Sequence, residues 1–473
     1  MKFTHDVIVI GAGAAGLTAA GGCAMFGLKA ALIERAEMGG ECLNNGCVPS
    51  KALITAAKRA AEANEYERFG IQMAAAKVNW TGVHAHIHEA IAHIAPHDSQ
   101  ERFEEMGCDV YRGHAHFTGP RTVEVDGVAL TAPKIVIATG SEPMVPPIEG
   151  LDSVPYLTNE NIWDLDHLPQ HLVIIGGGVI GMEMAQSFRR LGSEVTIIEP
   201  GDLMGRDDPE SVAVVVEQMK TEGVMFVKGA AAKVTPGVLA SLTVTLEDGQ
   251  EVAGTHLLIA TGRKARTEGY GLEEIGVELG RNGIKVDARR RTNLKHIYAI
   301  GDCREGPRLT HVSGYEGSNV ALEITLGVPT KVDWSALPWC TYTDPEVAQI
   351  GMTEAQAREE LGDKVTVVRQ GFEHNERAIA EGDTRGHLKV VMVGKKVLGA
   401  SIVGKNAGEM LLPFTQAITG KASTFALGSA IIAYPTRSEI TKAAAFSAWE
   451  GTVFGSVPKG YAKTRAWFRK TLR

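Results

Sequence analysis

Cys42 and Cys47 lie close together near the start of the chain, in the segment from Gly39 to Lys51. Five residues of regular helix rise about 7.5 Å, whereas a disulfide needs its two Cα atoms within roughly 7 Å. We therefore expect a break in the helix between the cysteines, with Gly46 as the point where the backbone deviates. A disulfide closed in such a bend is strained and easily reduced, so the pair can take up two electrons. The alternative is two buried free cysteines.

A glycine-rich turn precedes the cysteines. Residues 5–10, which end in four apolar residues at 7–10, are typical of a buried parallel strand. The turn after it and the following Ala-rich helix lead to a second apolar run that ends at Glu34. The glycines of the turn are Gly11, Gly13 and Gly16. This order of strand, turn, helix, strand and acid predicts a dinucleotide site, with the pyrophosphate at the helix N-terminus and Glu34 on a ribose hydroxyl.

The same arrangement recurs in the middle of the chain. The apolar run at 172–175 leads into a second glycine turn, and the next apolar run ends at Glu199. The glycines of this turn are Gly176, Gly178 and Gly181. The interval from Gly176 to Glu199 equals that from Gly11 to Glu34. Two complete fingerprints predict two dinucleotides bound at once, with a hydride relayed between them.

Glu199 also bears on which nicotinamide nucleotide is used. A carboxylate pairs with a free 2′-hydroxyl and repels a 2′-phosphate. We therefore expect NADH rather than NADPH. Arg206, in the loop that follows, is the feature that keeps NADPH as the alternative.

Three further segments combine an apolar strand with a short motif at its end: two end in Ala-Thr-Gly and one in Gly-Asp. Two of them share an Ala-Thr-Gly sequence and are predicted to be places where the chain leaves a dinucleotide-binding domain; their candidate cofactor-binding residues are Thr139, Gly140 and Gly262. The third is a buried strand at 297–300 that ends in Gly-Asp. Asp302 at its end is predicted to hold the sugar-alcohol hydroxyls of a flavin. Ordinary turns are the alternative for each segment taken alone.

Composition limits the class of protein. A length of 473 residues suggests roughly three domains at about 150 residues each, and a net charge of −8 argues against a general nucleic-acid surface. The six cysteines are too few for a secreted disulfide scaffold, so we expect a reducing, cytoplasmic location. A first strand starting by about Phe3 leaves no room for a signal peptide, and the apolar stretch at 422–437 is too short to span a bilayer.

These motifs resemble those of the flavin-dependent pyridine nucleotide–disulfide oxidoreductases, which include dihydrolipoamide dehydrogenase, glutathione reductase and mercuric reductase. The resemblance covers about 3–459. It implies an α/β protein with two Rossmann-like domains that bind FAD and NAD(P), and an α+β C-terminal domain that forms a homodimer whose active site is shared between subunits. The expected boundaries are 1–150 for the FAD-binding domain (completed by 285–335), 151–284 for the NAD-binding domain, 336–458 for the dimerisation domain and 459–473 for a basic tail.

The resemblance also implies roles for individual residues. Cys47 would be the thiolate that faces the flavin, and Cys42 would exchange with the acceptor. Lys51 would lie near the flavin N5, paired with Glu183. Gly40 would contribute to FAD binding. The helix that starts around His311 would direct its positive end toward the flavin. The alternatives are a surface role for Lys51 and a capping role for Glu183.

One departure from the family pattern concerns the acceptor. Members that reduce small disulfides carry His-Pro-Thr-x-x-Glu near the C-terminus, whereas this chain has Tyr434 in place of the histidine and keeps Glu439. An imidazole with a pKa near 6.5 exchanges protons with a thiol at neutral pH, and a phenol with a pKa near 10 does so poorly. General acid–base catalysis contributes about 10²–10⁴ in rate. Mercuric reductase is similar at this position, although this chain has no cysteine pair in its tail.

The sequence therefore predicts an NADH-dependent, mercuric-reductase-like flavoenzyme that reduces a metal ion, a quinone or another electrophile. A dihydrolipoamide dehydrogenase with an altered proton shuttle is the first alternative. A non-catalytic, NADH-responsive scaffold is the second, and the retained Cys42, Cys47, Lys51 and Glu183 argue against it.

Two weaker signals remain. Five histidines crowd residues 84–97, and His84/His88 and His93/His97 have the i, i+4 spacing of helical ligand pairs; we expect an exposed helix here, with metal binding as the open alternative. The basic, aromatic tail at 459–473 is expected to pack on its own dimer, with contact to an anionic membrane as the alternative.

Overall fold

The computed structural model describes residues 2–63, 65–72, 74, 76–238 and 241–471. Contacts divide the chain into two compact units. The first comprises residues 1–201 and 223–332, and the second comprises 202–222 and 333–473. The division into FAD-binding, NAD-binding and dimerisation domains remains a prediction at its boundaries. Leu472 and Arg473, at the end of the predicted tail, lie outside the described residues.

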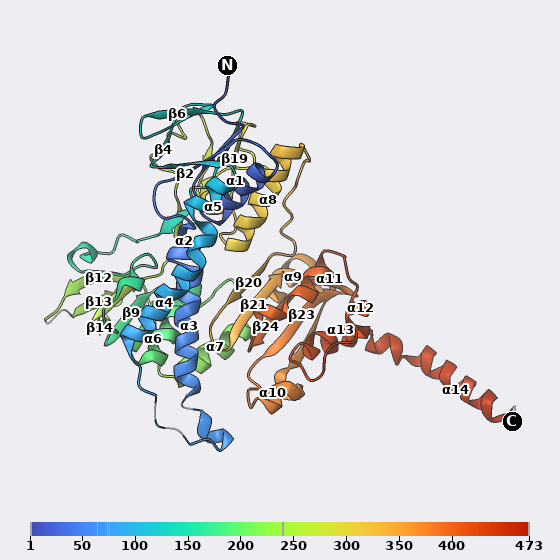
Figure 1. Cartoon of the computed structure of the whole chain (residues 1–473). Coiled ribbons are helices and arrows are strands. Elements are labelled where there is room, and N and C mark those ends of the chain that lie inside the picture. Colours follow the sequence, from blue (N-terminus) through green and yellow to red (C-terminus); the bar gives the residue numbers. More distant parts are fainter. Residues whose placement is uncertain (1, 64, 73, 75, 239–240, 472–473) are drawn as a thin grey trace. The chain divides into compact units, whose positions relative to one another are not determined.

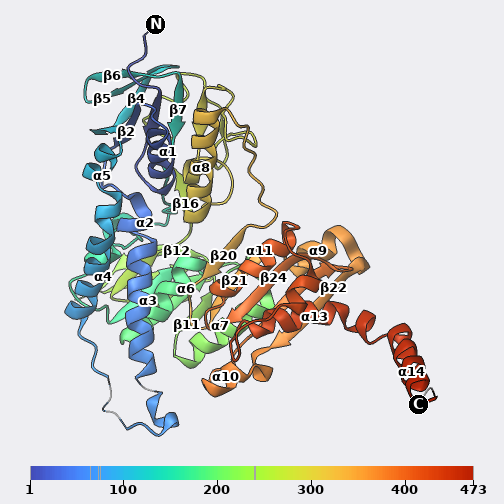
Figure 2. The same ribbon diagram turned by 45° about the vertical axis from the view of Figure 1, so that its right-hand side comes forward.

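A five-stranded parallel sheet forms the core of the N-terminal region. Its strand order is β19 (Ile297–Ala299), β7 (Lys134–Ile137), β1 (Val7–Ile10), β2 (Ala30–Glu34) and β3 (Cys108–Arg112). Strand β1 is apolar on both faces because both faces are covered. Val7 and Val9 pack in a cluster with residues of α1 (Ala14–Met25) and α8 (Thr310–Leu326), while Ile8 and Ile10 join a second cluster. Helices α1 and α8 lie side by side in both views (Figures 1 and 2).

A second parallel sheet repeats this plan in the same unit. Its order is β11 (Met225–Lys228), β10 (Glu194–Glu199), β9 (His171–Ile175) and β15 (His256–Ile259). Strand β9 leads through the second glycine turn into α6 (Val179–Leu191) and then β10, as β1 leads into α1 and β2. The two fingerprints predicted from the sequence thus occupy equivalent places in two parallel sheets, which is the fold class expected.

Smaller elements complete this unit. The antiparallel strands are β4 (Ala115–Gly119), β5 (Thr122–Val125) and β6 (Val128–Thr131); β12 (Ala231–Pro236), β13 (Leu242–Leu246) and β14 (Glu251–Gly254); β8 (Ser141–Pro143) with β16 (Arg263–Ala265); and β17 (Leu279–Gly280) with β18 (Gly283–Ile284). The remaining helices are α2 (Gly40–Asn44), α3 (Cys47–Glu62), α4 (Trp80–Ile94) and α5 (Gln100–Glu105). Helices α3 and α4 are neighbours (Figure 2).

The second unit is built on an antiparallel sheet. Its order is β20 (Pro338–Thr341), β21 (Glu346–Gly351), β24 (Lys396–Gly404), β23 (His387–Val393) and β22 (Val365–Gly371). Its helices are α7 (Pro209–Thr221), α9 (Glu354–Leu361), α10 (Glu376–Ala380), α11 (Leu412–Ile418), α12 (Thr424–Ser429), α13 (Glu439–Val453) and α14 (Ser456–Thr471). Ile402, Leu388 and Phe414 are among the buried residues of its core.

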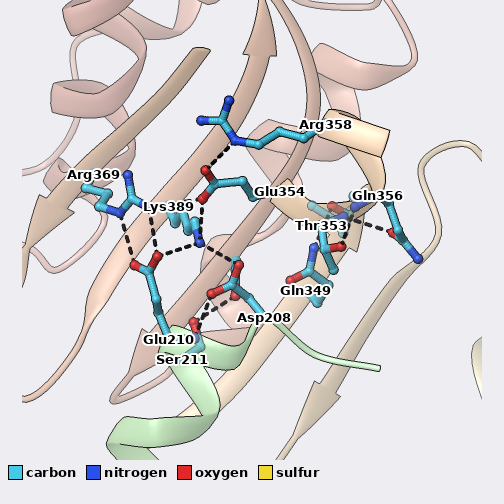
Figure 3. Close-up of polar contacts among 12 residues, drawn as sticks. Asp208, Glu210, Ser211, Gln349, Thr353, Glu354, Gln356, Arg358, Arg369 and Lys389 are labelled. Atoms are coloured by element: carbon cyan, nitrogen blue, oxygen red, sulfur yellow. Dashed lines mark hydrogen bonds and ion pairs between the residues drawn. The ribbon is translucent and has the colours of Figure 1, made fainter. Parts of the chain in front are cut away.

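A buried lysine attaches α7 to this sheet. The Nζ atom of Lys389 on β23 lies 2.8 Å from Asp208, 2.9 Å from Glu210 and 2.8 Å from Glu354 (Figure 3). Arg369 on β22 bonds to both Glu210 and Glu354. The Lys389 side chain is 3% exposed. Burying a charge is costly unless it is paired and hydrogen-bonded, and the three carboxylates meet that requirement.

The end of the chain is helical. The predicted tail forms most of α14, whose described side chains are exposed. In the part of the chain that the structure describes, no helix combines the length and apolar character needed to cross a bilayer.

Candidate functional site

The two glycine turns have the same backbone requirements. Gly11 has φ of +104° and Gly176 has φ of +114°. A Cβ atom on Gly11 would lie 2.3 Å from the carbonyl oxygen of Ala138, and one on Gly176 would lie 2.4 Å from that of Ala260. Both positions therefore need glycine for the turn itself. The third glycines are equally restricted, because a Cβ on Gly16 or Gly181 would meet the carbonyl of its own turn.

The middle glycines differ from the others. A Cβ on Gly13 would have its nearest neighbour at 3.9 Å, and one on Gly178 would meet nothing within 4 Å. The protein's own atoms leave room for a side chain at both positions, so the advantage of glycine there is the close approach of a ligand. This space beside a helix N-terminus fits a dinucleotide pyrophosphate.

Each predicted ribose acid bonds to its own glycine turn. Glu34 accepts the backbone N–H of Ala12 at 2.6 Å and that of Ala36 at 2.8 Å. Glu199 accepts those of Gly177 at 2.7 Å and Gly201 at 2.8 Å. The two carboxylates are therefore held at the ends of β2 and β10, beside the turns. Their contact with a ribose remains a prediction.

The two Ala-Thr-Gly segments lie next to each other. The hydroxyl of Thr139 donates to the carbonyl of Arg266 at 2.6 Å, and that of Thr261 donates to the carbonyl of Met144 at 2.6 Å. Strands β8 and β16, which follow them, pair antiparallel. Gly140 and Gly262 both have positive φ. The segments thus form a double crossing between the two parallel sheets.

Asp302 lies in this region too. It follows β19 at the carboxyl end of the first sheet, within a 3₁₀ turn at Gly301–Cys303. Its carboxylate accepts a hydrogen bond from Ser141 at 2.8 Å.

The cysteine segment has the broken helix that the spacing predicted. Helix α2 contains Cys42 and ends at Asn44, and α3 begins at Cys47. Gly46, between them, has φ −126° and ψ −104°, outside the helical region. Gly40 sets the position of α2, because a Cβ there would lie 2.7 Å from the Cα of Gly13. The cysteines therefore lie beside the first glycine turn.

The two thiols have opposite acidities. The hydrogen bond from Cys42 lowers the pKa of Cys47 to about 6, helped by the Thr310 hydroxyl and the charge of Lys51 and opposed by burial. The same hydrogen bond and burial raise the pKa of Cys42. Thr310 Oγ1 lies 3.2 Å from Cys47 Sγ and begins α8. Cys47 is thus the thiolate of the pair near neutral pH, with Cys42 as its proton donor.

Lys51 and Glu183 form the pair that the resemblance implied. Lys51 lies one helical turn after Cys47 on α3, and its Nζ is 2.9 Å from the carboxylate of Glu183 on α6. Glu183 is 4% exposed and Lys51 is 38% exposed. The buried carboxylate therefore holds a partly exposed cation beside the cysteines.

Sequence reasoning missed a polar network around the cysteine segment. Glu41, next to Cys42, contacts Arg263 and accepts from Asn159 at 2.7 Å. Burial raises the pKa of Glu41 to about 7, although Arg263 opposes the shift. The indole N–H of Trp163 donates to the carbonyl of Asn45 at 2.9 Å. These partners are far from Cys42 in sequence, and no spacing signal marks them. Thr310 precedes His311 in the sequence, and no local pattern marks its hydroxyl as a partner of Cys47.

The other predicted site residues are His311, Tyr434 and Glu439. His311 is the second residue of α8 and is exposed, next to the Thr310 that contacts Cys47. Tyr434, in the second unit, is 68% exposed, and its hydroxyl donates to Glu376. That bond raises the pKa of Tyr434 above its ordinary value. Glu439 begins α13 and accepts the N–H of Thr436 at 3.4 Å.

Comparison with known proteins agrees with these features. Residues 5–317 match the model of the pyridine nucleotide-disulphide oxidoreductase family, and residues 337–445 match that of its dimerisation domain. A mercuric reductase from Streptomyces lividans is 36% identical over 93% of this chain and 95% of its own length. A dihydrolipoyl dehydrogenase from Geobacillus stearothermophilus is 33% identical over the same shares of the two chains.

A solved structure is similar over nearly its whole length. The HOCl-induced flavoprotein disulfide reductase RclA from Escherichia coli, for which a Cu(II) complex is also known, superposes with a TM-score of 0.84. It is 28% identical, and the match covers 93% of this chain and 99% of that one. The chain therefore belongs to the pyridine nucleotide-disulphide oxidoreductases, enzymes that bind FAD and NAD(P)H and act as NAD(P)H-dependent flavin disulfide oxidoreductases.

Proposed function

We propose that the protein is an NADH-dependent reductase in which bound FAD supplies an electron pair from NADH to the Cys42–Cys47 disulfide. The reduced pair passes the electrons to a metal ion, a quinone or another electrophile rather than to a lipoyl group. The first glycine turn with Glu34 and Asp302 would hold FAD, and the second with Glu199 would hold NADH. The match to the dimerisation domain supports a homodimer, and the scarcity of close cysteine pairs favours a reducing, cytoplasmic location.

The two cysteines would have different roles because their pKa values differ. Two electrons and one proton convert the disulfide to the Cys47 thiolate and the Cys42 thiol, which is the arrangement that the lowered pKa of Cys47 and the raised pKa of Cys42 favour. Reoxidation by the acceptor re-forms the S–S bond and releases the proton. Lys51 would stabilise negative charge as it develops beside Cys47.

Tyr434 is the observation that favours an acceptor other than a lipoyl group. When a small disulfide is reduced, one of its sulfur atoms leaves as a thiolate and must be protonated. A group with a pKa near neutrality supplies this proton best. The bond to Glu376 raises the pKa of the Tyr434 hydroxyl, away from neutrality. Reduction of a soft metal ion consumes no proton, and a quinone takes its two protons on oxygen without a thiolate leaving group, so neither acceptor needs an imidazole that protonates a thiolate at this point.

The test is anaerobic NADH oxidation by the purified holoenzyme with lipoamide, Hg(II), Cu(II) and a quinone in parallel. We expect slow turnover with lipoamide and faster turnover with at least one metal ion or quinone. In Tyr434→His, lipoamide turnover should rise by at least tenfold, and Tyr342→His, another exposed tyrosine of the second unit, serves as the control. Fast lipoamide turnover by the wild type would instead identify a dihydrolipoamide dehydrogenase.

A further inference from the structure

The proposed function does not use His84 and His88 on α4. Their Nε2 atoms are 3.1 Å apart, and the ring centroids are 4.3 Å apart. Two ligands held about 2.0–2.1 Å from one metal ion, at an angle between about 90° and 110°, lie about 2.8–3.4 Å apart. The two imidazoles therefore already have the separation of ligands to a common ion. The sequence pair His93/His97 does not match them, because His97 lies beyond α4 in a 3₁₀ turn (Ala95–Asp98).

A third donor atom lies beside His88. The main-chain carbonyl oxygen of Trp163 is 3.3 Å from the Nε2 of His88, which is again within the range for two ligands of one ion. Trp163 is 5% exposed, and α4 is further attached to this segment by Trp80, whose indole donates to the carbonyl of Leu165 at 2.8 Å. The carbonyl is thus presented by a buried, anchored segment.

We propose that His84, His88 and the Trp163 carbonyl form a binding site for a divalent late transition-metal ion. Imidazole nitrogen suits Cu(II), Ni(II) and Zn(II), and Cu(II) binds most tightly to a given set of such ligands. Among the described residues there is no group of three His, Cys, Asp or Glu side chains placed to hold a metal. This site therefore has two side-chain ligands and one carbonyl, and its other positions are open to water or an exogenous ligand.

The site is connected to the redox-active cysteines through Trp163. The carbonyl of Trp163 faces His88, while its indole N–H donates to the carbonyl of Asn45, in the break between Cys42 and Cys47, and to that of Asn159 at 2.7 Å. A metal ion that draws the Trp163 carbonyl toward α4 would reduce the freedom of the segment that holds Asn45. Metal binding should therefore order the cysteine segment without contacting the thiols.

A hydrogen bond between the imidazoles explains the same 3.1 Å distance without a metal, and Cu(II) titration of the oxidised holoenzyme separates the two interpretations. In this state Cys42 and Cys47 are joined and do not compete as thiols. With glycine as a competing chelator, we expect one Cu(II) whose EPR spectrum shows coupling to two imidazole nitrogens. His84→Gln and His88→Gln should each weaken it at least tenfold, whereas His86→Gln, an exposed histidine on the same helix, should not.

Equal Cu(II) affinity in the three variants, or coupling to fewer than two nitrogens, would overturn the site. Hydrogen exchange of the oxidised holoenzyme with and without Ni(II) tests the connection. We expect slower exchange in the peptide covering 41–50 in the wild type and in His86→Gln, and no change in His88→Gln. Identical exchange with and without Ni(II) in the wild type would overturn the connection. Neither measurement depends on which acceptor the enzyme reduces.

Discussion

Two lysines in this protein are bonded to carboxylates in opposite ways. Lys389, in the second unit, is 3% exposed and lies within hydrogen-bond distance of Asp208, Glu210 and Glu354. Lys51, in the first unit, is 38% exposed and is held by Glu183. The charge of Lys389 is neutralised by the carboxylates around it. The charge of Lys51, in contrast, also lowers the pKa of Cys47. The comparison indicates that the first ion cluster holds a fold together and the second adjusts a reactive group.

The largest effect is expected at the buried cluster. Removing one partner of a buried ion pair costs about 3–5 kcal/mol, because the remaining charge is left uncompensated. Lys389→Ala leaves Asp208, which is 2% exposed, without its cation. We expect a loss of about this size in urea unfolding of the second unit. Lys421→Ala, at an exposed lysine of the same unit, is the control, and equal stability of the two variants would refute the structural role.

Lys51→Ala should reduce the rate of catalysis more than it reduces stability. Removing an electrostatic contact at a reacting centre typically costs about 10²–10³ in rate, and partial exposure reduces this, so we expect about a 10- to 100-fold loss of kcat. The melting temperature should fall less than in Lys389→Ala, because one buried carboxylate, Glu183, loses its cation instead of three carboxylates. Lys58→Ala, two turns along the same helix, should leave kcat within about twofold of the wild type. A stability loss like that of Lys389→Ala, with kcat retained, would remove the distinction between the two lysines.

The acidity of Cys47 provides a finer test. The pKa of this thiol is lowered to about 6, and Lys51 contributes to that shift. The thiolate should therefore form as the pH rises through about 6. In a Cys42→Ser protein, which keeps a hydroxyl as hydrogen-bond donor, the alkylation rate of Cys47 by iodoacetamide should rise with that midpoint. Adding Lys51→Ala should move the midpoint to higher pH, and an unchanged midpoint would show that the lysine charge does not reach the thiol.

The smallest effect concerns how the stability of the buried cluster depends on low pH. The bond from Arg369 lowers the pKa of Glu210 to about 2, with Lys389 helping. Because the folded-state pKa lies below the unfolded value of about 4.3, Glu210 contributes stability above the unfolded pKa, and this stability is lost as the pH falls through about 2. Its carboxylate is half exposed, so the contribution is modest. Between pH 5 and 2, Glu210→Gln should lose less stability than the wild type, as measured by thermal unfolding; an equal loss would contradict the assignment.

The parts of the site that could be predicted are those fixed by local backbone rules. Gly11 and Gly176 are required by positive φ and close carbonyls, and Gly46 by the break between two cysteines, so their spacing was visible in the sequence. Long-range partners had no such signal. The bond of Tyr434 to Glu376, the contact of Thr310 with Cys47 and the bond of Trp163 to Asn45 each join residues through tertiary packing. Their identity depends on how the chain folds back, which periodicity does not encode.

The most direct test of the central claim is to remove both thiols. Stopped-flow absorbance of the Cys42→Ser/Cys47→Ser holoenzyme would follow flavin reduction by NADH and its reoxidation by the acceptor that the wild type reduces fastest. If the cysteine pair carries the electrons, NADH should still reduce the flavin, while reoxidation by that acceptor should slow by at least 100-fold. Reoxidation at the wild-type rate would show that electrons leave the flavin directly and would contradict the proposed path through Cys42 and Cys47.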